Sequence, residues 1–467
     1  MAPGNVDELR SAVLAARASG RSVSIAGGRH AMGGQQFGAG TVHIDTRGLD
    51  RVIALDRHAG LVTVEGGIMW PALLGYLDAA QRHDPRPWGI YQKQTGADRL
   101  TLAGALACNA HGRGLTLPPM SGQVESFDLI DASGEIVTCS RTSHPDLFAL
   151  AIGGYGLFGI MTRITLRLQP RLNVRRIVDI VNIDGLMERF AGRIREGYLY
   201  GDFQFAIDAG DDSFLRRGVF ACYQPVEPGT PVTEHPVRFS ADEWTSLILD
   251  AHTNKRRAFE RYSQGYLRTS GQVYTTDAQL SGEYVEDYHG AVDRALGATV
   301  KGSEMITELD VPRDRFDAFM SDLRQRLRHR QADVIYGTVR LIERDTDTFL
   351  AWAREPWACV VLNLHVDHTD AAIARASETF RALIDVAIAH RGSYYLTYHR
   401  WARPDQMGRC HPQMGAFLEA KRRHDPGELF QSDWYRHTVR HSRLDPRAFD
   451  SYRCATLCRC PEASPSP

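Results

Sequence analysis

Residues 22–36 read SVSIAGGRHAMGGQQ, a short apolar strand that runs into a glycine-rich loop with one histidine, His30. The four glycines of this loop can adopt positive φ values and let successive backbone N–H groups converge on an anion. The loop therefore predicts a phosphate cradle. A plain surface turn has the same composition and is the alternative on this loop alone.

Two later stretches are also rich in small residues. Residues 96–114 read GADRLTLAGALACNAHGRG, where the backbone can approach a large planar ligand closely. Residues 152–168 read IGGYGLFGIMTRITLRL and contain a literal G-x-G-x-x-G. A nicotinamide-binding Rossmann fingerprint needs a strand before these glycines and a helix after them. Residues 146–152 instead predict a helix, and residues 160–168 alternate as a strand, so we reject that interpretation.

The bulk composition excludes several classes of partner. The 467 residues carry 55 basic and 56 acidic side chains, for a net charge of −1. Neither a basic excess nor a charged stripe is visible, which argues against nucleic acid and against an anionic membrane surface. No run reaches the roughly 18 apolar residues of a membrane helix, and the first residues lack a signal pattern. We therefore expect a cytoplasmic protein with no membrane association.

The eight cysteines are scattered and do not predict a disulfide framework. Cys454, Cys458 and Cys460, with Cys410 and His411 earlier in the chain, are the only arrangement that suggests zinc. Their C-x3-C-x-C spacing is not a standard one. The Pro/Ser-rich ending instead predicts a flexible tail, and we expect no metal site.

Four segments together resemble one family. In order they are GGRHAMGGQQF (27–37), QKQTGADRLTLAGALACNAHGRG (92–114), GGYGLFGIMTRITLRL (153–168) and KRRHDPGELFQSDWYRH (421–437). This order is similar to that of the vanillyl-alcohol-oxidase-type FAD oxidoreductases, whose flavin domain is of the PCMH type. The resemblance covers nearly the whole chain. The segment AHGRGLTLPP is closest in motif to sugar-lactone and polyol oxidoreductases.

The resemblance implies an α+β fold in which different parts of the chain bind the cofactor and the substrate. A PCMH-type FAD-binding domain of two α/β subdomains would occupy residues 1–172, and a substrate-binding cap domain on an antiparallel sheet would occupy residues 173–398. Residues 399–445 would return to the flavin domain, and residues 446–467 would form the flexible tail.

The resemblance also implies FAD as cofactor. His30 stands where the family places a histidine bonded to the flavin 8α-methyl group, which implies covalent attachment. Arg29 replaces a glycine that often precedes this histidine, and its guanidinium can instead meet the pyrophosphate. The cofactor-binding set implied by the resemblance is Gly27, Gly28, Arg29, His30, Ala31, Gln35, Thr95, Gly96, Asp98, Thr101, Gly104, Asn109, Ala110, His111, Gly112, Gly154, Gly159 and Ile160.

Ala110 carries information about the electron acceptor. In similar aldonolactone enzymes the residue before this His-Gly pair lies close to flavin C4a, where oxygen must react. Glycine there goes with oxidases and alanine with dehydrogenases. The resemblance therefore favours a dehydrogenase.

Polar side chains on later strands are the candidates for substrate chemistry. Tyr336 and Arg340 would share one face of a strand, and Asn363 and His365 one face of the next. His399 is a further candidate. Lys421 matches the Lys-x-x-x-Asp-Pro pattern that lies by the flavin in the family, where it would stabilise negative charge on the reduced ring.

Relatives that act on polyols often show Glu-x-Arg where this chain has Thr338-Val-Arg340. Loss of that carboxylate leaves the catalytic base and the substrate open. We expect oxidation of a CH–OH group of a small sugar-like alcohol, a polyol or a sugar-derived intermediate by hydride transfer to flavin N5, with oxygen or another carrier as acceptor. The alternatives are a hydrogen-peroxide-forming oxidase and a non-catalytic flavin-binding homologue.

Overall fold

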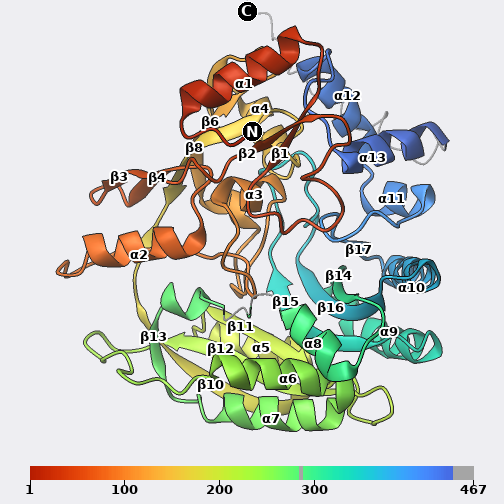
Figure 1. Cartoon of the computed structure of the whole chain (residues 1–467). Helices are drawn as coiled ribbons and strands as arrows, with labels where there is room; N and C mark the ends of the chain where they lie inside the picture. Colours follow the sequence, from red (N-terminus) through yellow and green to blue (C-terminus); the bar gives the residue numbers. More distant parts are fainter. Residues whose placement is uncertain (283–284, 286–287, 445–467) are drawn as a thin grey trace, which may run out of the picture.

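The computed structural model describes residues 1–282, 285 and 288–444. Cys454, Cys458 and Cys460 and the predicted tail over residues 446–467 lie outside this range. Helices and antiparallel sheets are mixed throughout, and the predicted α+β class is confirmed (Figure 1).

The N-terminal elements present the His30 loop. Helix α1 (Val6–Ala18) starts at Asn5, whose side chain accepts a hydrogen bond from the backbone N–H of Glu8. It leads into β1 (Val23–Ala26), which pairs in parallel with β2 (Val42–Asp45). The glycine-rich loop connects these two strands, so both of its ends are anchored in one small sheet.

A five-stranded antiparallel sheet completes the first part of the chain, in the order β3-β4-β8-β6-β7. Its strands are β3 (Val52–Asp56), β4 (Leu61–Glu65), β6 (Val124–Ile130), β7 (Ile136–Ser140) and β8 (Ile160–Arg167). The helices of this part are α2 (Trp70–Ala80), α3 (Leu102–Ala107) and α4 (Pro145–Ala151). Helix α4 precedes the third glycine stretch and strand β8 follows it, which confirms that this stretch is not a Rossmann fingerprint.

The second part is built on an eight-stranded antiparallel sheet, in the order β13-β10-β12-β11-β15-β16-β14-β17. Its strands are β10 (Asn173–Asn182), β11 (Tyr200–Phe205), β12 (Arg217–Pro225), β13 (Val273–Thr275), β14 (Gly302–Pro312), β15 (Val334–Ile342), β16 (Trp357–Asp367) and β17 (Ser393–Tyr394). The helices are α5 (Leu186–Arg195), α6 (Ala241–Thr253), α7 (Lys255–Leu267), α8 (Tyr288–Leu296), α9 (Phe316–His329) and α10 (Asp370–Ala389).

Alternation along β12 separates the two faces of this large sheet. Val219 and Ala221 point to the face that α7 covers. Phe220 points to the opposite face, where its ring lies 4.9 Å from the ring of Phe190 on α5. The sheet is therefore buried on both sides, and the α6–α7 face is the one that meets the site described below.

The C-terminal helices are α11 (Pro404–Cys410), α12 (Met414–His424) and α13 (Asp433–Leu444), and they lie beside the N-terminal elements (Figure 1). The backbone N–H of Val23 donates to Leu429 O over 2.6 Å, and Gln431 N–H donates to Val23 O over 2.9 Å. Asp433 N–H donates to Phe37 O over 2.7 Å. The end of the chain thus supports the strand and loop that carry His30.

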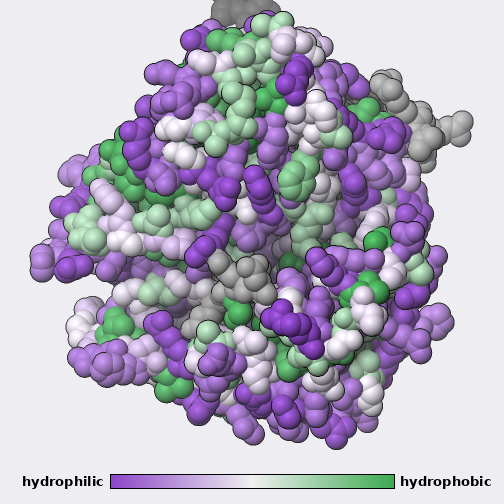
Figure 2. All heavy atoms as spheres, viewed as in Figure 1, coloured by the Kyte–Doolittle hydropathy of each residue, from purple (hydrophilic) through white to green (hydrophobic). Residues whose placement is uncertain are grey.

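The face shown in Figure 2 is mostly hydrophilic, with apolar residues scattered in small groups. Among the described residues, no helix combines the length and apolar character that a membrane crossing requires.

Candidate active site

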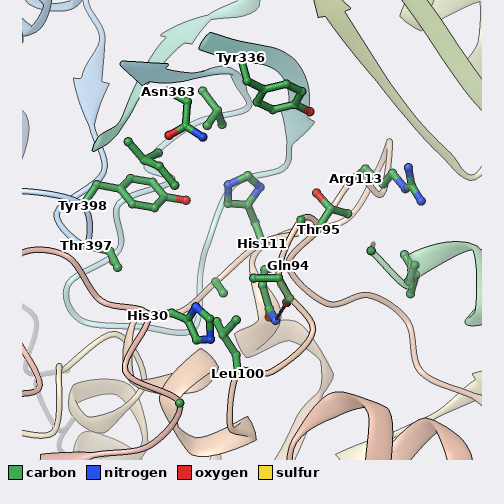
Figure 3. A pocket seen from close by; sticks show the side chains of 18 of the residues that line it. His30, Gln94, Thr95, Leu100, His111, Arg113, Tyr336, Asn363, Thr397 and Tyr398 are labelled. Atoms are coloured by element: carbon green, nitrogen blue, oxygen red, sulfur yellow. Dashed lines mark hydrogen bonds between the residues drawn. The ribbon is translucent and has the colours of Figure 1, made fainter. Parts of the chain in front are cut away.

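One cavity of about 1080 Å³ lies where the N-terminal part meets the α6–α7 face of the large sheet. All three small-residue stretches reach its wall, and so do side chains from β11, β15 and β16. In Figure 3, His30 and Leu100 lie on one side, Tyr336 and Asn363 on the other, and His111 between them. Segments far apart in the sequence therefore form one continuous site.

Most of the predicted cofactor residues line this cavity. They are Gly27, Gly28, Arg29, His30, Ala31, Gln35, Thr95, Gly96, Thr101, Gly104, Ala110, His111, Gly159 and Ile160. No single stretch of sequence predicts that these residues line one cavity, because each stretch is also compatible with a plain turn.

Four predicted cofactor residues lie outside the cavity wall. Asn109 is buried and donates to Asp345 Oδ2 over 2.8 Å. Asp98 forms an ion pair with a buried lysine. A Cβ atom added to Gly112 or to Gly154 would lie 2.5 or 2.1 Å from a backbone oxygen. Tight packing explains these two glycines without a ligand.

The backbone of the His30 loop does not have the positive φ values that we expected at its first two glycines. Gly27 and Gly28 do not have positive φ values, whereas Arg29 does, at 61°. An added Cβ would lie 2.0 Å from Thr101 Oγ1 at Gly27 and 2.4 Å from a backbone oxygen at Gly28. These glycines therefore allow the first stretch to pack on the second. The Arg29 guanidinium donates to Asp45 over 3.1 Å.

His30 is half-buried in the cavity wall. Burial lowers its pKa, which a hydrogen bond with the backbone of Arg99 only partly offsets. The neutral imidazole is therefore favoured at neutral pH, and it keeps a ring nitrogen with a free lone pair.

Polar side chains of the large sheet face the same cavity. Tyr336 and Arg340 come from β15, and Asn363 comes from the paired strand β16. Arg340 Nε and Asn363 Oδ1 are buried and have no hydrogen-bond partner. Burial raises the pKa of Tyr336, so this phenol stays protonated. These groups are available to bind a polar molecule.

Thr397 and Tyr398 also line the cavity, and sequence reasoning missed them. The signal was the short polar run Thr397-Tyr-His-Arg400, from which the next residue, His399, was chosen instead. Burial raises the pKa of Tyr398 well above its ordinary value, so its hydroxyl is a donor at neutral pH.

Three predicted catalytic residues are not in the cavity wall: His365, His399 and Lys421. His365 points toward Glu304. His399 is buried among aromatic rings, with the Phe380 ring centroid at 4.8 Å. The Lys421 ammonium is fully buried 2.5 Å from Asp425 Oδ2.

The Lys421–Asp425 pair supports the C-terminal segment. Asp425 also accepts backbone N–H groups of Leu429 and Phe430. We expect Asp425→Asn to lower the free energy of unfolding by about 3–5 kcal/mol, because it leaves a buried ammonium without its counter-charge. Denaturant unfolding measures this. Asp405→Asn removes the carboxylate of an exposed pair and should cost at most about 1 kcal/mol. Equal losses in the two variants would contradict this role.

Two buried histidines predict acid sensitivity. Burial lowers the pKa of His399 and of His411 to about 3. An unfolded histidine titrates near pH 6.5, so between these values the unfolded state binds more protons than the folded state. The free energy of unfolding should fall as pH is lowered through this window, by about 1.4 kcal/mol per pH unit for each histidine.

Denaturant unfolding at pH 7 and pH 5 measures the slope. His399→Gln should flatten it, because glutamine does not titrate, whereas His58→Gln at an exposed position should not. The same slope in all three proteins would contradict the assignment.

The cavity fits a large polar ligand. Gly96 in its wall has a φ of 87°, and no atom lies within 4 Å of a Cβ added there. Buried polar atoms in the wall without hydrogen-bond partners are Gln35 Oε1, Gln36 Oε1, Thr95 Oγ1, Asp202 Oδ1, Gln204 Oε1, Arg340 Nε and Asn363 Oδ1. These atoms are distributed along the cavity, as an extended dinucleotide requires, and the residues present fit FAD.

Residues 1–140 match the family model described as an FAD binding domain. Together with the fold and the cavity, this match supports an FAD-dependent oxidoreductase with a PCMH-type FAD-binding domain.

Within this class, the chain is similar over almost its full length to a sugar-lactone oxidoreductase. It is 24% identical over 439 residues to an L-gulono-1,4-lactone dehydrogenase of Mycobacterium tuberculosis, covering 94% of this chain and 95% of that protein. It is 28% identical over 174 residues to the L-gulonolactone oxidase of Mus musculus, covering 37% of each. Cytokinin dehydrogenase 5 of Oryza sativa subsp. japonica is 33% identical over 162 residues, covering 33% of this chain and 29% of that protein.

Proposed function

We propose that this chain oxidises a CH–OH carbon of a sugar lactone, a related sugar or a polyol, and that FAD takes up the hydride. The observation that carries the proposal is the shared cavity, which joins the glycine-rich stretches of the FAD-binding domain to Tyr336, Arg340 and Asn363. The long match to an L-gulono-1,4-lactone dehydrogenase supports the sugar-like substrate.

We propose a division of the chain that matches this chemistry. Residues 1–172 bind FAD, residues 173–398 bind the substrate, and residues 399–445 close the flavin side. The sheets of the described chain support these boundaries. The three smaller sheets, among them the short pair of β5 (Trp88–Gly89) and β9 (Gln169–Pro170), fall before residue 172, and the eight-stranded sheet falls after it.

FAD, when bound, supplies the hydride acceptor, N5 of its ring. The chain must hold the hydroxyl and stabilise the negative charge that develops on its oxygen. The Arg340 guanidinium is the donor for that charge, because its Nε is buried in the wall without a partner. Tyr336 and Asn363 orient the remaining substrate hydroxyls. As a protonated phenol, Tyr336 donates a hydrogen bond and does not act as the base.

We propose Asp202 as the acceptor of the hydroxyl proton. Strands β11 and β15 pair Phe203 with Val339, and continuing this register by one residue sets Asp202 opposite Arg340. Residues so placed have Cβ atoms roughly 4.5–5.5 Å apart on one face. The missing carboxylate of the Glu-x-Arg pattern is thus replaced from the neighbouring strand.

The contacts of Asp202 suit this role. Its Oδ2 lies 3.6 Å from Arg113 Nη1, and its buried Oδ1 has no hydrogen-bond partner among the described residues. One oxygen is therefore held by a cation, while the other is available to a hydroxyl proton.

We further propose that the enzyme is a dehydrogenase and that its flavin is bonded to His30. Ala110 is buried in the cavity wall beside His111, and we propose that its methyl group restricts the approach of oxygen to the reduced flavin. We expect Ala110→Gly to increase the rate at which oxygen reoxidises the reduced enzyme, measured by stopped-flow absorbance. Ala107→Gly, another small wall position, is the control. An unchanged rate in Ala110→Gly would contradict a gating role.

Anaerobic mixing with a panel of alcohols tests the proposed function. L-gulono-1,4-lactone, related aldonolactones, sugars and polyols are each added to the yellow protein, and the visible absorbance is followed. Bleaching by one of these compounds is the expected result. Bleaching followed by rapid recovery in air would identify an oxidase. No bleaching by any of them would overturn the proposed substrate class.

A further inference from the structure

Three histidines and one glutamate converge beside the cavity, and two of the four residues, His289 and Glu304, reach its wall. Glu304 on β14 lies at the centre, with His252 from α6, His289 from α8 and His365 from β16 around it. The Glu304 Oε1 atom is 3.2 Å from His252 Nε2 and 3.1 Å from His365 Nδ1. Its Oε2 atom is 2.8 Å from His289 Nδ1. The four elements lie together in Figure 1.

Hydrogen bonding inside this cluster is incomplete. Glu304 accepts from the Tyr288 hydroxyl over 2.6 Å and has a hydrogen bond with His365. The His252 side chain is only 3% exposed and its Nε2 lies 3.2 Å from Glu304 Oε1, but the two groups are not aligned for a hydrogen bond. A buried ring nitrogen that lacks a well-aligned hydrogen bond is costly in a network that serves only for packing. The same nitrogen is well suited to coordinate an ion.

Neighbouring groups hold the His365 ring in place in the same way as the ring of a metal-binding histidine is held. Its Nδ1 faces Glu304, while its Nε2 lies 3.4 Å from Asp367 Oδ1. A carboxylate on the far nitrogen orients many metal-binding histidines. A Cβ added to Gly302 would lie 2.2 Å from His365 Cε1, so the ring rests directly on the backbone of β14.

We propose that His252, His289, Glu304 and His365 bind a divalent transition-metal ion, with Zn²⁺ as the first candidate. Imidazole nitrogens combined with one carboxylate oxygen are typical zinc ligands, and they also suit Co²⁺ and Ni²⁺. The donor atoms of His252, Glu304 and His365 already lie within 4.8 Å of one another. Small side-chain movements would bring them around one ion.

The position of the ion gives it contact with the substrate end of the cavity. Glu304 and His289 are part of the cavity wall. His365 follows Asn363 by two residues on the same face of β16, which separates them by about 7 Å. An ion held here could take an oxygen ligand from a substrate while staying apart from the glycine-rich stretches. Sequence spacing gave no sign of it, because the four ligands come from four separate elements.

Metal uptake by the flavin-loaded protein tests the proposal without any activity assay. The purified protein is stripped with a chelator and titrated with Zn²⁺ in a calorimeter, and bound metal is counted by mass spectrometry. We expect one ion per chain. With Co²⁺, absorption bands of a bound ion should appear at longer wavelengths than those of the flavin.

Variants locate the ion. His289→Ala is the mildest change, because this side chain is 40% exposed, and Glu304→Gln keeps the shape of the central residue. Each should weaken Zn²⁺ binding by at least the roughly 10–100-fold that loss of an outer-shell partner costs. His368→Ala is the matched control, since His368 directly follows β16 and contacts Ser303 on β14 outside the cluster.

Thermal melting and the flavin spectrum establish that each variant is folded. Failure of the wild-type protein to take up Zn²⁺, Co²⁺ or Ni²⁺ would overturn the proposal. Unchanged uptake by His289→Ala and Glu304→Gln would overturn it as well, by placing the ion elsewhere, for example at His111, Glu308 and Cys359. None of these measurements depends on which substrate the enzyme oxidises. The metal proposal can therefore fail while the proposed function holds, and the reverse is also true.

Discussion

Arg340→Ala should lower kcat/KM for the best alcohol substrate by about 10²–10³-fold, the cost of removing one preorganised donor from a developing negative charge. Arg340 lies in the cavity wall on β15, and its buried Nε has no partner within the described chain. Steady-state kinetics with the best compound of the panel measure the loss. FAD content should stay at the wild-type level, because the proposed FAD-binding residues lie in the first part of the chain.

Two variants sharpen this prediction. Arg340→Lys keeps the charge but loses the planar donor fork, so it should recover only part of the rate. Arg175→Ala removes an exposed arginine from β10 of the same sheet and should leave kcat/KM unchanged. An Arg340→Ala enzyme with wild-type kcat/KM would exclude Arg340 from the reaction.

His30→Ala should abolish covalent attachment of the flavin. After acid precipitation, the wild-type pellet should keep its yellow colour, whereas the His30→Ala pellet should be colourless with FAD in the supernatant. The reason is that the half-buried His30 ring in the cavity wall is favoured in its neutral, nucleophilic form. His58→Ala, at an exposed position in the turn between β3 and β4, should behave as the wild type. Release of all FAD from the wild-type protein would show that no such bond exists.

Much of the fold was predictable because its local patterns are strong. The alternation in residues 160–168 predicted strand β8, and the helix before the third glycine stretch excluded a Rossmann fold. The small-residue stretches predicted where the backbone comes close to other atoms. At Gly27 and Gly28 the close neighbour is Thr101 and the backbone beside it, and not a ligand as we expected. The sequence alone does not show which atoms a glycine allows to come close.

The candidate site was predicted less completely, because it depends on pairing between distant strands. Alternation placed Tyr336 and Arg340 on one face, but it could not reveal that Asp202 would be set opposite Arg340 by the β11–β15 register. Likewise, alternation placed Asn363 and His365 on one face of their strand. Asn363 lines the cavity, but His365 is hydrogen-bonded to Glu304 and lies outside the cavity wall.

His399 and Lys421 show a second limit. Lys421 became a candidate through a family motif, and His399 as a polar side chain that could take part in proton transfer. Packing decides their environment: His399 is enclosed by aromatic rings, and Lys421 is neutralised by Asp425 four residues later. A buried polar residue with a local partner stabilises the fold, and its sequence motif does not distinguish this role from one at the flavin.

A crystal structure of the FAD-loaded protein would show whether FAD occupies the cavity. We expect electron density for one FAD there, with its ring system between His30 and the Tyr336–Arg340 strand and its pyrophosphate against the glycine-rich loop after β1. Density for the flavin at another place, or a colourless protein that cannot be reconstituted with FAD, would contradict this expectation.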